Sequence, residues 1–185
     1  MNNKTDLRII KTKNLLYHTL EELMKTKSFE EIKVSDICNS ALINRSTFYS
    51  HYNDKYELLQ EYINNLKDLL IKELSKNQNI KNSKEYYLEM LNLLLDHIDA
   101  KKDTYAKIMI NNKNSITMDI FYDVINKDII HQIKDSEKIP GEIIARFYLG
   151  AVFNVCLEWL NSGSKYTKED LINYLNLLIP NDLHN

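Results

Sequence analysis

A run of polar side chains at residues 45–51 carries most of the chemistry that this sequence offers. Its guanidinium, hydroxyl and imidazole groups can all hydrogen-bond to phosphates or to base edges. They belong to Arg45, Ser46, Thr47, Tyr49 and His51. The apolar residues of the same run, Phe48 and Tyr52, are four apart and therefore share one face of a helix. A short helix with one buried face and one hydrogen-bonding face is suited to reading the major groove of DNA.

Three helices are predicted to position this run. Ser35 is a favourable N-cap for a helix over residues 36–41, and Asn44 can cap the next helix over 45–52. Asp54 and Glu57 have the spacing of a capping box at the start of a longer helix. Two short helices joined by a tight turn and followed by a third are typical of a helix-turn-helix module.

Two cations are placed to contact DNA directly. Arg45 opens the predicted recognition helix, and the N-terminal residues of such helices meet base edges. Its guanidinium can bind guanine N7 and O6, although a surface ion pair with Asp36 is the alternative. Lys55 begins the following helix, where its ammonium and the helix dipole would both favour a phosphate. The Ser35 hydroxyl is expected to offer a further contact at another helix N-terminus.

The composition bounds the class of protein. Only 3 Gly and 2 Pro occur in 185 residues, which disfavours a turn-rich β fold and predicts an all-α fold. The formal net charge of −2 provides no global basic field. Cys38 and Cys156 are expected to be small buried hydrophobes, with a redox-sensing pair as the alternative. Since no leader and no run of about 18 apolar residues is found, we expect a cytoplasmic, soluble protein.

The apolar periodicity predicts about nine helices in two domains. Residues 1–60 would form the helix-turn-helix domain, including a first helix over 6–25 with one apolar stripe. A fourth helix over 54–74 would connect it to a helical domain spanning 61–185. The further helices are expected at 84–101, 103–112, 115–137, 140–162 and 167–179.

The helix over 140–162 has an apolar arc too wide for one neighbouring helix to cover. Gly150 in its middle costs roughly 1 kcal/mol relative to Ala and would allow another helix backbone to approach closely. Tight packing within one subunit is one interpretation, and contact across a dimer is the other. A four-helix interface between two subunits would use this helix and the last one. Its expected residues are Phe147, Gly150, Ala151, Val155, Trp159, Leu171, Leu175 and Leu178.

Residues 34–59 resemble the DNA-binding segment of the TetR/AcrR family of transcriptional regulators. The family pattern is a Ser/Thr cap, an Ile-Ala-type helix, a Gly-Val-Ser turn, a recognition helix ending in Tyr-x-His-Phe, and a Lys before a Leu-Leu pair. The matching residues are Ser35, Ile37, Ala41, Ile43, Asn44, Thr47, Phe48, Tyr49, His51, Tyr52, Lys55, Leu58 and Leu59. The C-terminal half, around Phe147, Gly150 and Trp159, is similar to regulators of the dihydroxyacetone-kinase type.

The resemblance implies roles for individual residues. Tyr49 and His51 resemble the phosphate-binding residues of the family, with partial burial in the small core as the alternative. Asn44 replaces the usual Ser and keeps its capping chemistry. Leu42 replaces the usual Gly of the turn, where a positive φ is costly for any other residue.

The resemblance also implies a homodimer that binds a pseudo-palindromic operator, with repression as the family default. Two recognition helices would then lie about one DNA turn apart, roughly 34–36 Å. A small-molecule effector would bind between helices of the second domain and change the spacing of the two DNA-reading heads; no cofactor or metal is implied. The candidate effector-binding residues are Met90, Leu94, His97, Tyr105, Met109, Phe121, Ile125 and Phe147.

Two other functions are weighed against this one. An enzyme is not expected, because the 5 His show no metal-ligand spacing and 3 Gly cannot form a phosphate-binding loop. The stronger rival is a regulator-like dimer that has abandoned DNA and acts as a coactivator through a protein partner. The set Arg45, Thr47, Tyr49, His51 and Lys55 favours DNA binding, whereas Leu42 favours the coactivator.

Overall fold

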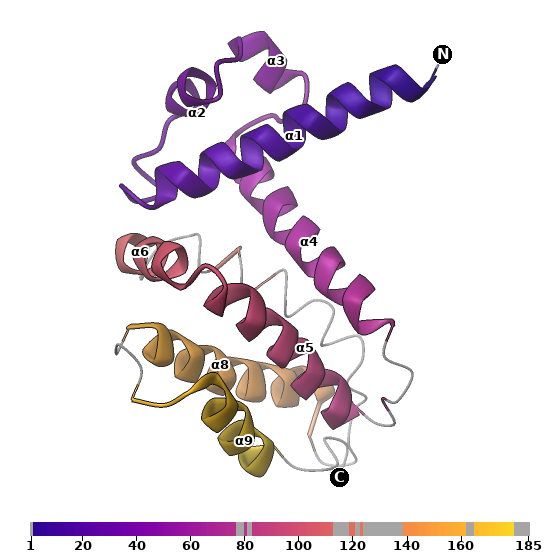
Figure 1. Cartoon of the computed structure of the whole chain (residues 1–185), viewed down its shortest axis with the longest axis vertical. Helices are drawn as coiled ribbons and strands as arrows, with labels where there is room; N and C mark the ends of the chain where they lie inside the picture. Colours follow the sequence, from indigo (N-terminus) through magenta and orange to yellow (C-terminus); the bar gives the residue numbers. More distant parts are fainter. Residues whose placement is uncertain are drawn as a thin grey trace. The chain divides into compact units, whose positions relative to one another are not determined.

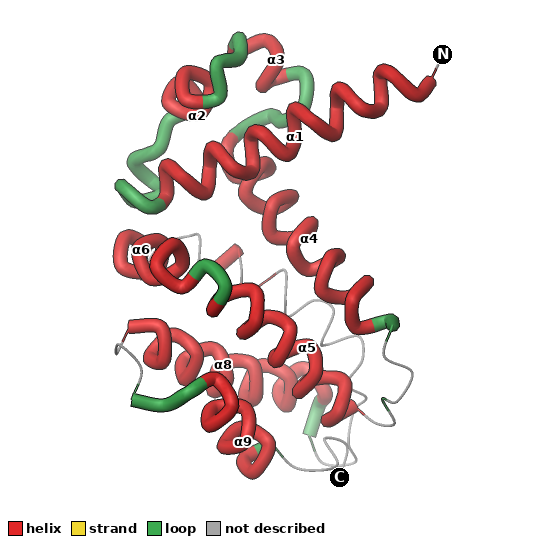
Figure 2. Tube along the Cα trace, viewed as in Figure 1, coloured by secondary structure: helices red, strands yellow, loops and turns green. Residues whose placement is uncertain are grey.

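A computed structural model of the chain describes residues 2–76, 80, 83–112, 119–120, 123, 139–161 and 165–179. Within these residues every regular element is a helix (Figure 2), so the predicted all-α fold is confirmed. In chain order they are α1 (Asn2–Met24), α2 (Val34–Ser40), α3 (Arg45–Tyr49), α4 (Lys55–Leu74), α5 (Ser83–Asp99), α6 (Lys102–Asn112), α8 (Gly141–Asn161) and α9 (Lys168–Leu178) (Figure 1). The helix predicted at 115–137 falls almost entirely outside the described residues.

The helix boundaries differ from the prediction mainly around the helix-turn-helix. Lys33, not Ser35, is the N-cap of α2, because the Asp36 carboxylate accepts a hydrogen bond from the Lys33 N–H at 3.0 Å and closes the helix start there. Ser35 therefore lies in the first turn of α2. The helix α3 ends at Tyr49, although the N–H groups of His51 and Tyr52 still donate to Phe48 O at 2.9 and 3.0 Å.

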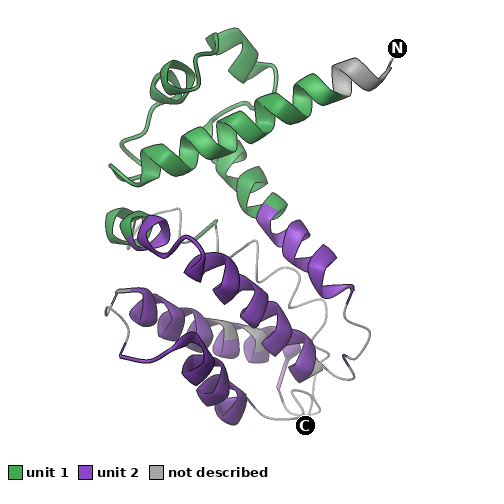
Figure 3. Ribbon diagram, in the orientation of Figure 1, with its two compact units in different colours: residues 1–65, 107–121 green, residues 66–106, 122–185 purple. Residues whose placement is uncertain are grey.

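Two compact units make up the chain (Figure 3). Unit 1 contains residues 1–65 and 107–121, and unit 2 contains residues 66–106 and 122–185. The core of unit 1 consists of apolar residues from α1, α2, α3, α4 and the segment between α1 and α2. Its most buried members are Leu16, Leu20, Phe29, Ile32, Ile37, Phe48, Leu58 and Leu59. Phe29 and Ile32 thus anchor the segment between α1 and α2 in this core.

The last residues of α6 belong to unit 1. Asn112 is only 1% exposed; its Oδ1 accepts the Phe29 N–H at 2.7 Å, and its Nδ2 donates to Ile108 O at 2.8 Å. Asn111 Nδ2 donates to Met24 O at 3.3 Å and to Lys25 O at 3.0 Å. The two asparagine side chains therefore hydrogen-bond to backbone groups at the C-terminal end of α1 and in the following turn that have no partner within the helix itself.

In unit 2, α5 and α9 pack against each other. Trp159 is 4% exposed and donates from Nε1 to Tyr166 O at 3.0 Å, while Leu171 and Leu175 of α9 are equally buried. Because these three side chains are buried within the single chain, they present no surface to a second subunit. Their assignment to a dimer interface was wrong.

Several apolar side chains of helix α8 are exposed in the part of the chain that the structure describes. Its Gly141–Leu160 stretch is long and apolar enough, by length and composition, to cross a membrane. An apolar helix of a soluble protein meets the same two conditions. The described side chains of α8 are mostly exposed or half-buried, and Trp159 and Leu160 near its C-terminal end are buried. The exposed apolar residues of α8 include Ile143, Phe147 and Val155.

Candidate nucleic-acid interface

A tight turn joins α2 to α3 (Figure 1). The Ile43 N–H donates to Cys38 O at 3.0 Å, and the Leu42 N–H donates to Asn39 O at 3.3 Å. These two bonds form a Schellman motif with Leu42 at its C′ position, where Gly is usual. Leu42 has φ 53°, which costs a non-glycine residue about 1–2 kcal/mol. The turn of the helix-turn-helix is therefore kept although its sequence lacks the Gly.

The two faces of α3 separate as the sequence predicted. Phe48 and Tyr52 are buried, and their ring centroids lie 5.8 Å apart. Arg45, Ser46 and Tyr49 are exposed at the surface, with Asn44 beside them at the N-cap, and Thr47 and His51 are half-buried. Asn44 makes no side-chain capping bond, so its amide remains at the surface of the module.

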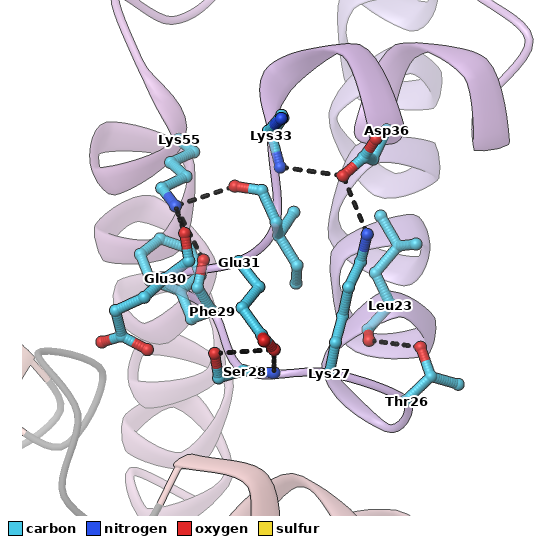
Figure 4. Close-up of polar contacts among 11 residues, drawn as sticks. Leu23, Thr26, Lys27, Ser28, Phe29, Glu30, Glu31, Lys33, Asp36 and Lys55 are labelled. Atoms are coloured by element: carbon cyan, nitrogen blue, oxygen red, sulfur yellow. Dashed lines mark hydrogen bonds and ion pairs between the residues drawn. The ribbon is translucent and has the colours of Figure 1, made fainter.

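The Arg45 guanidinium has no hydrogen-bond or ion-pair partner within the described part of the chain. The alternative partner, Asp36, is bonded instead to Lys27 Nζ at 2.8 Å (Figure 4). Five N–H donors at the start of α3 are thus available to an acceptor outside the protein. The placement is what recognition of a base edge or a phosphate requires.

The end of α3 is anchored by α1 and α4. Burial of Tyr52 raises the pKa of its hydroxyl, which lies near Tyr17 and Glu61. Lys13 donates to Glu61 Oε1 at 2.5 Å, and this bond raises the pKa of Lys13. Lys13 Nζ also lies 5.7 Å from the centroid of the Tyr52 ring. This contact fixes the buried face of α3 and leaves the opposite face free.

Lys55 has a different role from the predicted one. Its Nζ donates to the carbonyl oxygens of Phe29 at 2.7 Å, Glu30 at 2.9 Å and Ile32 at 2.8 Å (Figure 4). Partial burial lowers the pKa of Lys55. An ammonium has three N–H donors, and all three are used here. We therefore correct its assignment: Lys55 ties the segment after α1 to the start of α4 and has no donor left for a phosphate.

The backbone at the start of α4 is also occupied by the protein itself. Asp54 Oδ1 accepts the N–H groups of Tyr56 at 2.8 Å and Glu57 at 2.9 Å. The Glu57 carboxylate accepts the Asn53 N–H at 2.6 Å, one residue before the position that a standard capping box would use. Two carboxylates thus satisfy the donors that would otherwise bind an anion at this helix end.

Comparison with known proteins identifies this arrangement. Residues 16–62 match the family described as bacterial regulatory proteins, tetR family, and residues 85–181 match the family described as transcriptional regulator C-terminal region. The chain belongs to the TetR family of transcriptional regulators. The first match covers α2, α3 and parts of α1 and α4, and the second covers most of α5 and all of α6, α8 and α9.

Individual relatives resemble this TetR-family regulator over most of its length. The HTH-type dhaKLM operon transcriptional activator DhaS of Lactococcus lactis subsp. lactis (strain IL1403) is 27% identical over 165 residues, covering 85% of this chain and 83% of that protein. The structure of a TetR transcriptional regulator from Streptococcus agalactiae 2603V has a TM-score of 0.65 at 25% identity, covering 94% of this chain and 96% of that one. The structure of the dihydroxyacetone kinase operon activator DhaS has a TM-score of 0.51 at 25% identity, covering 91% and 92%.

The expected effector-binding residues of the TetR-family chain are dispersed. Met90, Leu94, His97 and Tyr105 are half-buried in unit 2, where His97 Nε2 lies 2.7 Å from the Tyr105 hydroxyl. Met109 is buried in unit 1. Phe121 and Ile125 lie outside the described residues. Phe147 is 69% exposed, so it was wrong to place it in an interior pocket.

Several structural residues of the DNA-binding unit were missed from sequence. Lys27, Asn111 and Asn112 hold backbone or carboxylate groups next to α1 and α2. The two asparagines end a predicted helix, and Asn at a helix end was the available signal. Nothing in the sequence assigns their partners, which lie 83–87 residues away along the chain.

Asp36 makes the stability of this unit depend on pH. Its carboxylate accepts bonds from Lys27 Nζ and the Lys33 N–H, and these bonds hold its pKa below the usual range. A carboxyl whose pKa is lower in the folded state stabilises the fold at any pH above its unfolded-state pKa of about 4. This stabilisation is lost as the pH falls through the folded-state pKa. We expect Asp36→Asn to lower the melting temperature at pH 7 and to flatten its decline under acid.

Circular dichroism melts over a series of pH values measure this effect. Asp68→Asn is the matched control, because Asp68 is an exposed acid on α4 whose replacement should leave the acid decline unchanged. An Asp36→Asn melting curve that declines with acid as steeply as the wild type would show that the pair contributes nothing.

Proposed function

We propose that this protein regulates transcription by binding a pseudo-palindromic DNA operator as a homodimer, with α3 as the recognition helix. The observation that carries the proposal is the state of Arg45. Its guanidinium is exposed at the first position of α3 and has no partner in the described chain, while Phe48 and Tyr52 hold the helix from the other side. Ser46, Thr47 and Tyr49 supply further donors along the same helix, and His51 follows two residues after its end. Asn44 is its N-cap, and Ser35 lies in the first turn of α2.

Fluorescence anisotropy with DNA from upstream of the gene for this protein tests the proposal. Binding should resist scrambled competitor DNA, and it should weaken as salt rises, because the phosphate contacts release counterions. Equal affinity for scrambled DNA would contradict an operator-specific regulator. No binding to that DNA, or to any duplex selected from a random-sequence pool, would contradict DNA binding altogether.

The homodimer is supported by apolar residues of α8 and α9 that are exposed in the described part of the chain. We call these residues the α8–α9 surface: Ile143, Phe147, Ala151, Val155, Tyr174, Leu177 and Leu178. Exposed apolar area of this extent in a monomer marks a contact with another protein. Gly150 adds to the argument, since a Cβ atom built there would meet nothing within 4 Å among the described residues outside its own helix turn. Close approach by a helix of the partner subunit would explain a glycine in the middle of α8, whereas packing within the described subunit does not.

Phe147→Ala is expected to weaken the dimer by at least about 100-fold, because burial of an aromatic side chain contributes about 1.5–3 kcal/mol and a two-fold dimer loses this side chain twice. Light scattering at a series of protein concentrations measures the dissociation constant. Ile110→Ala is the matched control, since Ile110 is also 69% exposed but lies on α6. A variant Phe147→Ala that dimerises as tightly as Ile110→Ala would exclude Phe147 from the interface.

The proposed regulator responds to a small molecule bound in unit 2. Half-buried Met90, Leu94, His97 and Tyr105 offer an apolar surface with one polar pair, which suits a largely apolar ligand with a hydrogen-bonding group. Binding would favour one domain arrangement and change the spacing of the two α3 helices. We propose release from the operator on ligand binding, with the protein acting as a repressor in the cytoplasm.

The alternative functions are an activator and a coactivator that works through a protein partner. The activator reading is supported by the relative DhaS, which is named as a transcriptional activator. Deletion of the gene distinguishes a repressor from an activator, since transcription of the target genes rises when a repressor is lost and falls when an activator is lost. Replacing Arg45 and Tyr49 together by Ala distinguishes a DNA-binding regulator from a coactivator. The regulator would lose operator binding, whereas the coactivator would still bind its protein partner.

A further inference from the structure

Leu42 holds a strained backbone conformation that the folded chain does not explain. Its φ of 53° is the left-handed conformation that Gly adopts freely and Leu does not. Its side chain is 93% exposed, so burial within the chain offsets almost none of the strain. Gly or Asn at this position would hold the same Schellman motif at lower cost. Strain of this kind is found where a residue serves a contact outside its own fold.

The position of Leu42 indicates what that contact is. It lies two residues before Asn44, the N-cap of α3, and three before Arg45. The N-terminal end of a recognition helix is the part that approaches base edges. The other exposed residues around the turn, Asn39, Ser40, Asn44 and Arg45, are polar. Among the exposed residues from 39 to 46, Leu42 is therefore the one with a branched alkyl side chain.

We infer that Leu42 is a specificity-determining residue that contacts the 5-methyl group of a thymine next to the base pairs read by α3. The thymine methyl is the apolar group that base pairs present in the major groove, and an alkyl side chain discriminates it by excluding water from both surfaces. This inference rests on the proposed function. It adds an apolar contact to the polar contacts of Arg45 and Ser46.

The test compares thymine with deoxyuridine, which lacks the methyl group and pairs identically. The probe is a duplex that the wild-type protein enriches from a random-sequence pool, with each thymine replaced in turn. At one thymine in each half-site, the wild type should lose about fourfold in affinity for each methyl removed. Leu42→Gly should bind the thymine and deoxyuridine duplexes equally at that position.

Two further variants separate contact from folding. Leu42→Asn tolerates positive φ and should also lose the methyl preference, whereas Leu42→Met stays apolar and should retain it. Melting temperatures of the Gly and Asn variants should equal or exceed the wild-type value, because backbone strain is relieved. Lower melting temperatures in both would show that Leu42 serves the fold, which overturns the inference.

Two results on the DNA side also overturn it. The first is a Leu42→Gly protein that keeps the wild-type preference for every thymine methyl; the proposed function would stand. The second is an enriched duplex with no thymine at which deoxyuridine weakens wild-type binding. Failure of the wild type to enrich any duplex is a separate outcome that removes the proposed function and this inference together.

Discussion

Arg45→Ala is expected to reduce operator affinity by about 100-fold. A bidentate Arg–guanine contact discriminates by about 1–3 kcal/mol, and a dimer loses one such contact in each half-site. The free energy of unfolding should stay within about 0.5 kcal/mol of the wild type, because the side chain is exposed and unpaired in the described chain. Anisotropy titration of the selected duplex measures the affinity, and urea unfolding measures the stability.

The pattern of loss distinguishes base reading from phosphate binding. If Arg45 reads a base, the variant also loses its preference at one base pair per half-site, and Arg45→Lys does not restore it because the ammonium lacks the planar fork. If Arg45 binds only phosphate, affinity falls equally for all duplexes and the salt slope decreases by about 1 per contact. Unchanged affinity in the Ala variant would remove Arg45 from the interface.

Lys55→Met is expected to destabilise the protein by about 3 kcal/mol. The substitution leaves the carbonyl oxygens of Phe29, Glu30 and Ile32 without their donor. Buried acceptors that lose a partner cost about 1–3 kcal/mol each, and partial access of water to this site reduces the sum. Urea unfolding followed by circular dichroism measures the change.

Lys72→Met is the matched control for Lys55, since it removes an exposed lysine from the last turn of the same helix. It should shift stability by no more than about 0.5 kcal/mol. Lys55→Arg should rescue little, because a planar fork cannot converge on three carbonyls as an ammonium does. Wild-type stability in Lys55→Met, together with a smaller salt slope in DNA binding, would restore the phosphate assignment that the structure led us to correct.

The sequence was sufficient to predict the described helices and the exposed face of α3. Periodicity located α4 and α8 within a residue or two, since their apolar positions repeat every three or four residues. The alternation of Phe48 and Tyr52 with polar residues identified the recognition helix. That Leu42 adopts the positive φ of the turn was seen only in the structure, because a positive φ usually requires Gly and the sequence has Leu there.

The errors came from contacts between residues distant in the chain. Lys55 has the sequence signature of an anion-binding helix start, but its three acceptors lie 23–26 residues earlier. Trp159 and Leu175 lie on helices that are apolar on more than one side, so periodicity could not decide which side faces the subunit's own core. Phe147 and Leu178, on the other sides of those helices, are the exposed ones.

The asparagine pair at the end of α6 bears on how such regulators can be recombined. A chimera that grafts the first 65 residues onto another sensor would leave the Phe29 N–H and the Met24 and Lys25 carbonyls without the amides of Asn112 and Asn111. The transferable DNA-reading part is therefore discontinuous in the gene. A graft that also carries residues 107–112 at the matching helix end keeps the head intact, and biosensor designs should place both junctions accordingly.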